Sequence, residues 1–225
     1  YSGPSTLHTL LEGLSGLEFA GLAAAWPRLI RQPKGNGQPV FVSPGFLADH
    51  NSTLIIRRYL DFLGYKTCGW DLGRNDGNVH RLVGEAVKQI DSLYRQSREP
   101  IALVGWSLGG VISRAIARER PGLISQIITM GSPIQGGPKY TAFARRYADQ
   151  GIDLNRLADF VEFRESVPIH RPITAIYTKT DGIVAWQACI DRHNKQTEHI
   201  EVKTTHMGLG FNKDVLITIA NKLAR

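Results

Sequence analysis

A serine between two glycines lies where an apolar run of the sequence gives way to a helical pattern. The pentapeptide GWSLG, residues 105–109, joins the apolar run at 101–106 to a helical segment that continues to residue 117. In a tight strand-to-helix turn, glycine relieves crowding at the flanking positions while serine projects its hydroxyl above the sheet. The unpaired N–H groups and positive dipole end of the helix would stabilise an oxyanion there. The motif predicts a nucleophilic Ser107; a glycine-rich packing turn, the alternative, leaves the serine unexplained.

A serine hydroxyl needs a base, and usually an acid that orients the base. In the G-x-S-x-G arrangement these follow in the order acid and then histidine, each after a later strand. Asp181 comes directly after the strand-like residues 173–179, and His206 directly after residues 199–205. We therefore predict Asp181 as the orienting acid and His206 as the general base and acid. A simple turn role is the alternative for Asp181.

The other acids and histidines fit these roles less well. Asp153, Asp159 and Asp191 fall in helical or connecting segments, and His50 follows the first strand, where capping fits it better than a place at the edge of the site. The remaining histidines lie on helices, at a strand start or in loops of the wrong register; they are His8, His80, His170, His193 and His199.

The loop after the first strand supplies a candidate oxyanion hole. This strand runs into SPGFL, residues 43–47, and a glycine there lets a backbone N–H turn toward the serine. We nominate the N–H of Phe46, together with that of Leu108. Leu47 is the neighbouring alternative.

Alternating strand and helix patterns predict the fold. The expected strands are residues 39–44, 65–70, 101–106, 124–132, 173–179 and 199–205, with amphipathic helices between them, the clearest at 78–95. Strands that each lead into a helix require right-handed crossovers, hence a mostly parallel sheet covered on both faces. The prediction is one α/β domain over residues 1–225, with chemistry at the carboxyl ends of about six strands.

Two segments lie outside this repeat. The N-terminal helical segment, residues 1–37, is expected to cover an edge or face of the sheet; contact with a membrane surface is the weaker alternative, because Glu12, Glu18 and several glycines interrupt its apolar pattern. Residues 133–172 form an insertion of about forty residues. We expect two cap helices packed on the body, with a mobile lid or an acyl tunnel as alternatives.

Composition and charge exclude several function classes. The 225 residues carry a net charge of +7, but the lysines and arginines are scattered without the basic stripe of a nucleic-acid reader. Cys68 and Cys189 lie far apart, without metal-ligand spacing, and read as packing residues. We expect no metal or organic cofactor and no nucleic acid partner. With no membrane span or signal peptide in this sequence, the expected location is cytoplasmic; the oligomeric state stays open.

Five motifs together resemble the α/β-hydrolase superfamily. PGF, GWSLGG, GSPIQG, TDGIVAW and THMGLG follow in the order seen in its bacterial lipase and esterase branch, from about Gln38 to the C-terminus. The chain also looks like a compact bacterial group that begins with a helix where larger relatives have two extra strands. The resemblance implies Ser107 as nucleophile, His206 as base, Asp181 as its orienter, and an oxyanion hole at Phe46 and Leu108.

Residues near the strand ends are expected to form the substrate pocket. Many lipases have histidine before the nucleophile, whereas this chain is similar to some polyester-degrading cutinases in having tryptophan, which implies an aromatic wall. The expected wall residues, with core packing as the alternative, are Trp106, Ile134, Val184, Trp186 and Met207.

These residues predict hydrolysis of a small-molecule, lipid or polyester ester through an acyl-enzyme. An acyltransferase or thioesterase using the same serine is the enzymatic alternative. A non-catalytic binding protein is the third hypothesis, and it predicts the loss of a catalytic group.

Overall fold

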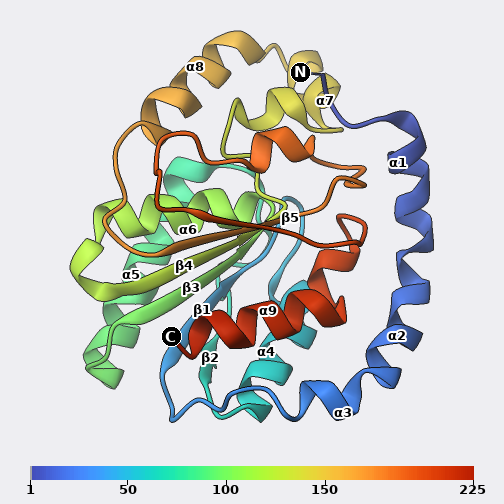
Figure 1. Cartoon of the computed structure of the whole chain (residues 1–225). Coiled ribbons are helices and arrows are strands. Elements are labelled where there is room, and N and C mark those ends of the chain that lie inside the picture. The colour runs from blue at the N-terminus through green and yellow to red at the C-terminus, as the bar shows by residue number, and fades with distance from the viewer. Residues whose placement is uncertain (1) are drawn as a thin grey trace.

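A six-stranded parallel sheet runs through the middle of the protein (Figure 1). The computed structural model describes residues 2–225. The strands are β1 (Pro39–Ser43), β2 (Lys66–Cys68), β3 (Ile101–Trp106), β4 (Ile124–Met130), β5 (Ile173–Tyr177) and β6 (Glu198–Glu201). Their order is β2-β1-β3-β4-β5-β6, and every neighbouring pair is parallel. This confirms the predicted fold class.

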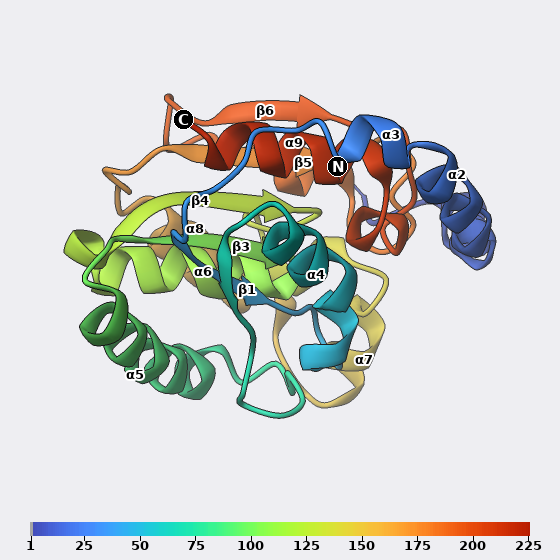
Figure 2. The ribbon, with the colours of Figure 1, turned by 90° about the horizontal axis from the view of Figure 1, so that it is seen from below.

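Helices cover both faces of the sheet, as Figures 1 and 2 show for α5 and α6 on one side and α9 on the other. The long helices are α4 (Leu54–Phe62), α5 (Val79–Ser97), α6 (Leu108–Glu119) and α9 (Lys213–Leu223). One apolar core joins α5 and α6 to the sheet, and a second core joins α4 and α9 to its other face. The central strands β1 and β3 are buried along their whole length, and burial on both faces is why they are almost entirely apolar.

The N-terminal segment forms a chain of short helices beside the sheet, at the right of Figure 1. It contains α1 (Thr6–Leu11), the 3₁₀ helix η1 (Glu12–Leu17), α2 (Glu18–Ala24) and α3 (Trp26–Leu29). We call these residues, 6–29, the N-terminal arm. Leu29 and Ala25 enter the core between α4 and α9, whereas α1 and α2 have no buried residue among those described. The arm therefore contributes to the apolar core only near its α3 end.

The insertion after β4 lies over the carboxyl ends of the strands, at the top of Figure 1. It contains the 3₁₀ helix η4 (Gly137–Tyr140), α7 (Ala144–Asp149) and α8 (Leu154–Glu165). Asp153 caps α8 by accepting hydrogen bonds from the N–H groups of Asn155 and Arg156. In the part of the chain that the structure describes, no helix is long and apolar enough to cross a membrane.

The connection from β5 to β6 differs from the predicted pattern, because it contains no α-helix among its described residues. Its only helical turn is the 3₁₀ helix η5 (Trp186–Cys189). Asp181 accepts the N–H groups of Ile183 and Val184, and Asp191 accepts the N–H groups of two residues that follow it. Such local side-chain bonds compete with helix formation. Three further 3₁₀ turns are η2 (His50–Thr53), η3 (Pro121–Leu123) and η6 (Gly208–Gly210).

Candidate active site

Ser107 lies on a strained turn between β3 and α6. Its backbone has φ 55° and ψ −122°, a conformation that residues other than glycine rarely adopt. A side chain at Gly105 would approach the Gly109 carbonyl oxygen to 2.5 Å, and one at Gly109 would overlap the carbonyl of Ser43 in β1. The Ser107 N–H donates to the Met130 carbonyl at 2.7 Å. Backbone on both sides thus holds the turn in place.

His206 and Asp181 form a buried pair at the ends of neighbouring strands. The Nδ1 atom of His206 lies 2.7 Å from Oδ2 of Asp181. The other oxygen, Oδ1, accepts the N–H groups of Ile183 and Val184 at 2.9 and 2.7 Å. With Asp181 bound on both oxygens, Nδ1 of His206 is the protonated nitrogen and Nε2 is free to act as a base.

Opposing effects set the protonation of His206. Burial of the imidazole lowers its pKa, but the charge and hydrogen bond of Asp181 and the charge of Glu12 outweigh burial, so the pKa of His206 is raised above its ordinary value. A raised pKa makes the neutral imidazole of His206 a stronger base.

Ser107 and His206 border the same small cavity, of about 120 Å³. Among the hydrogen bonds of residues 2–225, none joins the Ser107 hydroxyl to His206. Such bonds often form only when substrate is bound. Trp106 and Met207 line the same cavity, and the Trp106 indole donates to the His206 carbonyl at 3.2 Å.

The loop after β1, which carries Phe46, lies beside Ser107. Gly45 lies directly against Ser107, since a side chain there would approach the Ser107 Cβ to 3.2 Å. The N–H of Leu47 already donates to the Asn75 carbonyl at 2.7 Å, whereas among the described residues the Phe46 N–H has no acceptor. Leu108 is the first residue of α6, where N–H groups lack helical partners. This geometry favours Phe46 over Leu47.

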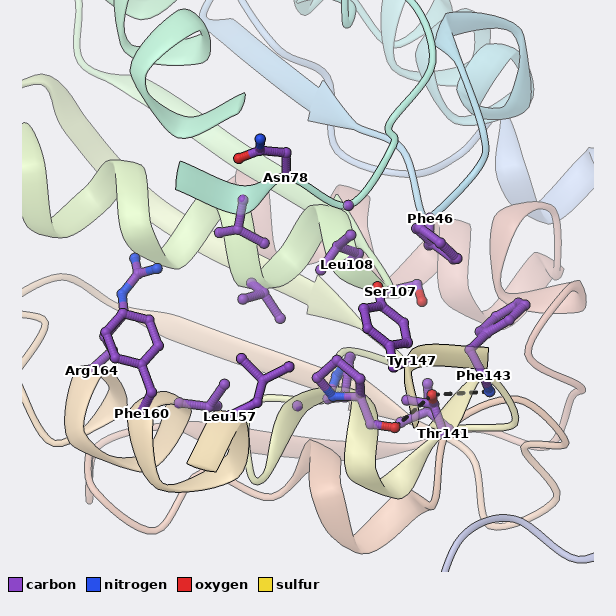
Figure 3. Close-up of a pocket in the computed structure, with 18 of the residues that line it drawn as sticks. Phe46, Asn78, Ser107, Leu108, Thr141, Phe143, Tyr147, Leu157, Phe160 and Arg164 are labelled. Atoms are coloured by element: carbon purple, nitrogen blue, oxygen red, sulfur yellow. Dashed lines mark hydrogen bonds between the residues drawn. The ribbon is translucent and has the colours of Figure 1, made fainter. Parts of the chain in front are cut away.

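A larger apolar pocket of about 280 Å³ opens from Ser107 between the body and the insertion. Figure 3 shows it with Ser107 and Phe46 at one end and Phe160 and Arg164 at the other. Its walls come from α6, from the start of α5, from the insertion and from the loop after β5, including Leu108, Val111, Val79, Phe143, Tyr147, Leu157, Phe160, Val161 and Val184. The insertion therefore forms one side of a pocket beside the serine.

Of the five expected wall residues, three border these cavities. Val184 lines the larger one, and Trp106 and Met207 line the smaller one. Ile134 and Trp186 are not among the lining residues of either cavity, and their place in the substrate pocket stays a prediction. Ile134 is buried, and Trp186 stacks on the Tyr177 ring with 5.8 Å between centroids.

Asp191 and His50 have other partners. Asp191 is buried and lies 2.8 Å from the Arg114 guanidinium. Burial raises its pKa, but the charge of Arg114 and the hydrogen bonds from Asn194, Arg114 and Thr197 together outweigh burial, so the pKa of Asp191 is lowered. His50 lies 3.8 Å from Asp71 and lines neither cavity. Within residues 2–225, no group of three His, Cys, Asp or Glu side chains is placed to hold a metal ion.

Sequence reasoning missed three buried polar residues around the site. Asn75 accepts from Leu47, donates through its side chain to the Pro44 carbonyl at 3.0 Å, and so fixes the loop that carries Phe46. Arg114 of α6 binds Glu165 at the end of α8 at 2.7 Å. Glu12 of the arm binds the loops of Asp181 and His206. No short motif marks such contacts, because each joins distant parts of the chain.

Comparisons with known proteins agree with this architecture. Residues 73–147, a third of the chain, match the family described as the PGAP1-like alpha/beta domain. A search of the curated proteins finds no match.

Solved structures extend the likeness to most of the chain. A lipolytic enzyme from the metagenome-derived pair LipS and LipT is 14% identical, with a TM-score of 0.67 over 86% of this chain and 94% of that one. Est1E from Butyrivibrio proteoclasticus is 14% identical, with a TM-score of 0.62 over 85% and 90%. A monoacylglycerol lipase from Paleococcus ferrophilus is 17% identical, with a TM-score of 0.60 over 83% and 96%. Its parallel sheet, its strand order and these neighbours show that the chain has the α/β-hydrolase fold.

Proposed function

We propose that the protein is a serine hydrolase that cleaves carboxylic esters through an acyl-enzyme. One observation carries the proposal. Ser107, on its strained turn, borders a cavity with His206, and His206 is bound to the buried Asp181 at 2.7 Å. A nucleophile, a base and an orienting acid at neighbouring strand ends are the parts that acyl transfer requires.

In the proposed reaction, the Ser107 hydroxyl oxygen attacks the ester carbonyl carbon while Nε2 of His206 takes the hydroxyl proton. The carbonyl oxygen becomes an oxyanion that accepts hydrogen bonds from the N–H groups of Phe46 and Leu108. As the intermediate collapses, the bond to the alcohol oxygen breaks and that oxygen takes the proton from His206. Water, deprotonated by His206, then repeats the attack and releases the acid. Asp181 stabilises the imidazolium in both steps.

The two cavities suggest how the ester lies. The alcohol oxygen must face His206 to receive its proton, so the alcohol occupies the small cavity lined by Trp106 and Met207. The acyl chain then enters the apolar pocket between body and insertion. At about 280 Å³, this pocket is at the small end of ligand sites, which favours short and medium acyl chains.

The structural neighbours support this choice of chemistry. LipS and LipT are described as lipolytic, and the protein from Paleococcus ferrophilus is a monoacylglycerol lipase. Both activities cleave carboxylic esters of fatty acids.

The test is hydrolysis of p-nitrophenyl esters of increasing acyl length by the wild type, Ser107→Ala and His206→Ala. We expect a loss of kcat/KM on the order of 10⁴-fold or more in both variants, because members of a triad act as a unit. His80→Ala, an exposed histidine on α5, is the matched control and should keep full activity.

Three results would contradict the proposal. They are full activity in Ser107→Ala, turnover of no ester together with no fluorophosphonate adduct on Ser107, and release of acid only when a thioester replaces the ester. Formation of a new ester from an added alcohol, faster than release of acid, would favour the acyltransferase alternative.

A further inference from the structure

Glu12 of the N-terminal arm contacts both loops that carry the proposed acid and base. Its Oε1 accepts the N–H of Gly182, next to Asp181, at 2.8 Å. The same oxygen accepts the N–H of His206 at 2.8 Å, and Oε2 accepts the N–H of Met207 at 2.8 Å. One carboxylate therefore ties the backbone beside the acid to the backbone of the base.

The surroundings of Glu12 are built for this contact. The residue is 9% exposed, and a buried carboxylate is costly unless several donors satisfy it. Thr9, on the preceding helix, donates its hydroxyl to the Gly182 carbonyl at 2.7 Å. Gly182 itself lies so close that a side chain there would overlap the backbone of His8. The arm thus meets the loop after β5 in a close backbone fit.

Glu18, a second acid of the arm, binds residues on either side of His206 in the sequence. Glu18 accepts the Thr204 hydroxyl at 2.7 Å and the Asn212 side-chain amide at 2.6 Å. The apolar contacts of α2 are at its surface, where Phe19 stacks on Phe211 with 4.2 Å between centroids and the partly buried Leu22 packs against the core. Glu12 and Glu18 face inward, so they do not serve as a solvated acidic face.

We propose that Glu12 is a positioning residue, which holds the Asp181 and His206 loops together so that the imidazole is aligned between Asp181 and Ser107. The inference rests on the proposed serine-hydrolase function. Glu12 lies behind the backbone of both loops and touches no reacting atom. Its removal should leave both side chains present but no longer held at the working geometry, and small displacements of catalytic groups are expensive in rate.

The charge of Glu12 provides a signature that simple loss of packing lacks. The charged groups facing His206 are Asp181 from the loop after β5 and Glu12 from η1, with Glu18 of α2 bound to the preceding residues of the loop. Since Glu12 raises the pKa of His206, its neutralisation should lower that pKa. The base then stays neutral to lower pH, even though the enzyme is slower.

The experiment compares wild type, Glu12→Gln and two controls. Glu119→Gln removes the same charge at an exposed site on α6, and Thr9→Val removes an arm contact to Gly182 without changing charge. Two readouts are used: kcat and KM for p-nitrophenyl butyrate against pH, and NMR titration of ¹⁵N-labelled His206, assigned with His206→Asn. The NMR readout does not depend on ester turnover, so it tests Glu12 even if the proposed function fails.

For Glu12→Gln we expect kcat to fall on the order of 10- to 100-fold with little change in KM. The acid limb, which is the fall of kcat at low pH, and the NMR titration of His206 should both move to lower pH. Glu119→Gln should match the wild type, and Thr9→Val should slow the enzyme less without moving the limb. If Glu12→Gln does not fold, Glu12→Asp, which keeps the charge but shortens the reach, should lower kcat at an unmoved limb. A folded Glu12→Gln protein with wild-type kcat and an unmoved His206 titration would overturn the proposal. So would a Glu12→Asp protein with wild-type kcat.

Discussion

The nucleophile turn and the histidine loop lie at the same edge of one sheet, but different parts of the chain hold them. The turn, residues 105–110, is held by its own glycines against the backbone of β1. The histidine loop, residues 203–208, is held by side chains from the N-terminal arm, with Glu12 lying 194 residues before His206. One half of the proposed site is therefore locally determined and the other is assembled from both ends of the chain.

This difference explains why a sequence motif indicates the nucleophile turn, whereas no motif indicates the contacts of the histidine loop. Side chains at 105 and 109 would collide with fixed backbone atoms, so these positions require glycine and appear in the sequence as a motif. A carboxylate that accepts backbone N–H groups places no demand on the types of residue that donate them. Glu12 binds the main-chain N–H groups of Gly182, His206 and Met207, so the residue types at these positions do not indicate a partner.

The largest effect on stability is expected from breaking the turn. Gly109→Ala places a methyl group against the Ser43 carbonyl, which is fixed in β1, so the free energy of unfolding should fall by about 3 kcal/mol. The matched control is Gly84→Ala on α5, where an added Cβ meets nothing within 4 Å and helix propensity predicts a gain of about 0.5–1 kcal/mol. Urea denaturation measures both. Equal midpoints for the two variants would show that the turn is not sterically fixed.

The largest effect on catalysis concerns the pair at the histidine loop. Asp181→Asn should lower kcat/KM on the order of 10⁴-fold, because the imidazole loses its orienting charge. In the wild type, protonation removes the base, so kcat/KM falls as pH drops through the raised pKa of His206. In Asp181→Asn, which lacks this charge, the fall of kcat/KM should occur at lower pH than in the wild type. Asp159→Asn, exposed on α8, is the control; a loss of activity there instead would reassign the acid.

A smaller effect extends the comparison to the insertion. Leu157→Phe adds volume to the wall of the apolar pocket and should disfavour octanoate relative to acetate about tenfold, as discrimination by pocket size usually does. Phe163→Leu, on the same helix but 71% exposed, should leave the ratio unchanged. Competition between the two p-nitrophenyl esters measures the ratio, and equal ratios in both variants would place the acyl chain elsewhere.

The smallest effect tests the second acid of the arm. Glu18→Gln weakens the bonds to Thr204 and Asn212 but leaves His206 directly bound by Glu12, so we expect a loss of about 1 kcal/mol in transition-state stabilisation, roughly fivefold in kcat/KM. A loss larger than that of Glu12→Gln would make Glu18 the main support of the loop.

Much of the architecture could be predicted because it repeats a simple period. The strands, their parallel order and the placement of Ser107, Asp181 and His206 after strand ends follow from apolar runs and turn residues. The predicted helix after each strand is missing between residues 178 and 197. Backbone N–H groups of this region donate to the Asp181 and Asp191 side chains, and hydrophobic periodicity does not indicate such bonds. Trp186, one of the expected wall residues, belongs to the same region.

The N-terminal arm shows most clearly what could not be predicted from the sequence. Glu12 and Glu18 are acids in an apolar segment, and they weakened the membrane interpretation without indicating any role of their own. In the structure both acids point to the histidine loop, whereas Leu7, Leu10 and Leu14 are exposed. Which residues of an arm face inward is decided by its partner, and the partner lies at the other end of the chain.

A crystal structure of the protein treated with an alkyl fluorophosphonate would test the central claim most directly. We predict a covalent bond from phosphorus to the Ser107 oxygen, the phosphoryl oxygen within about 3 Å of the N–H groups of Phe46 and Leu108, and the alkyl chain in the apolar pocket. An adduct on another residue, or a phosphoryl oxygen directed away from both N–H groups, would contradict the assignment of Ser107 and its oxyanion hole.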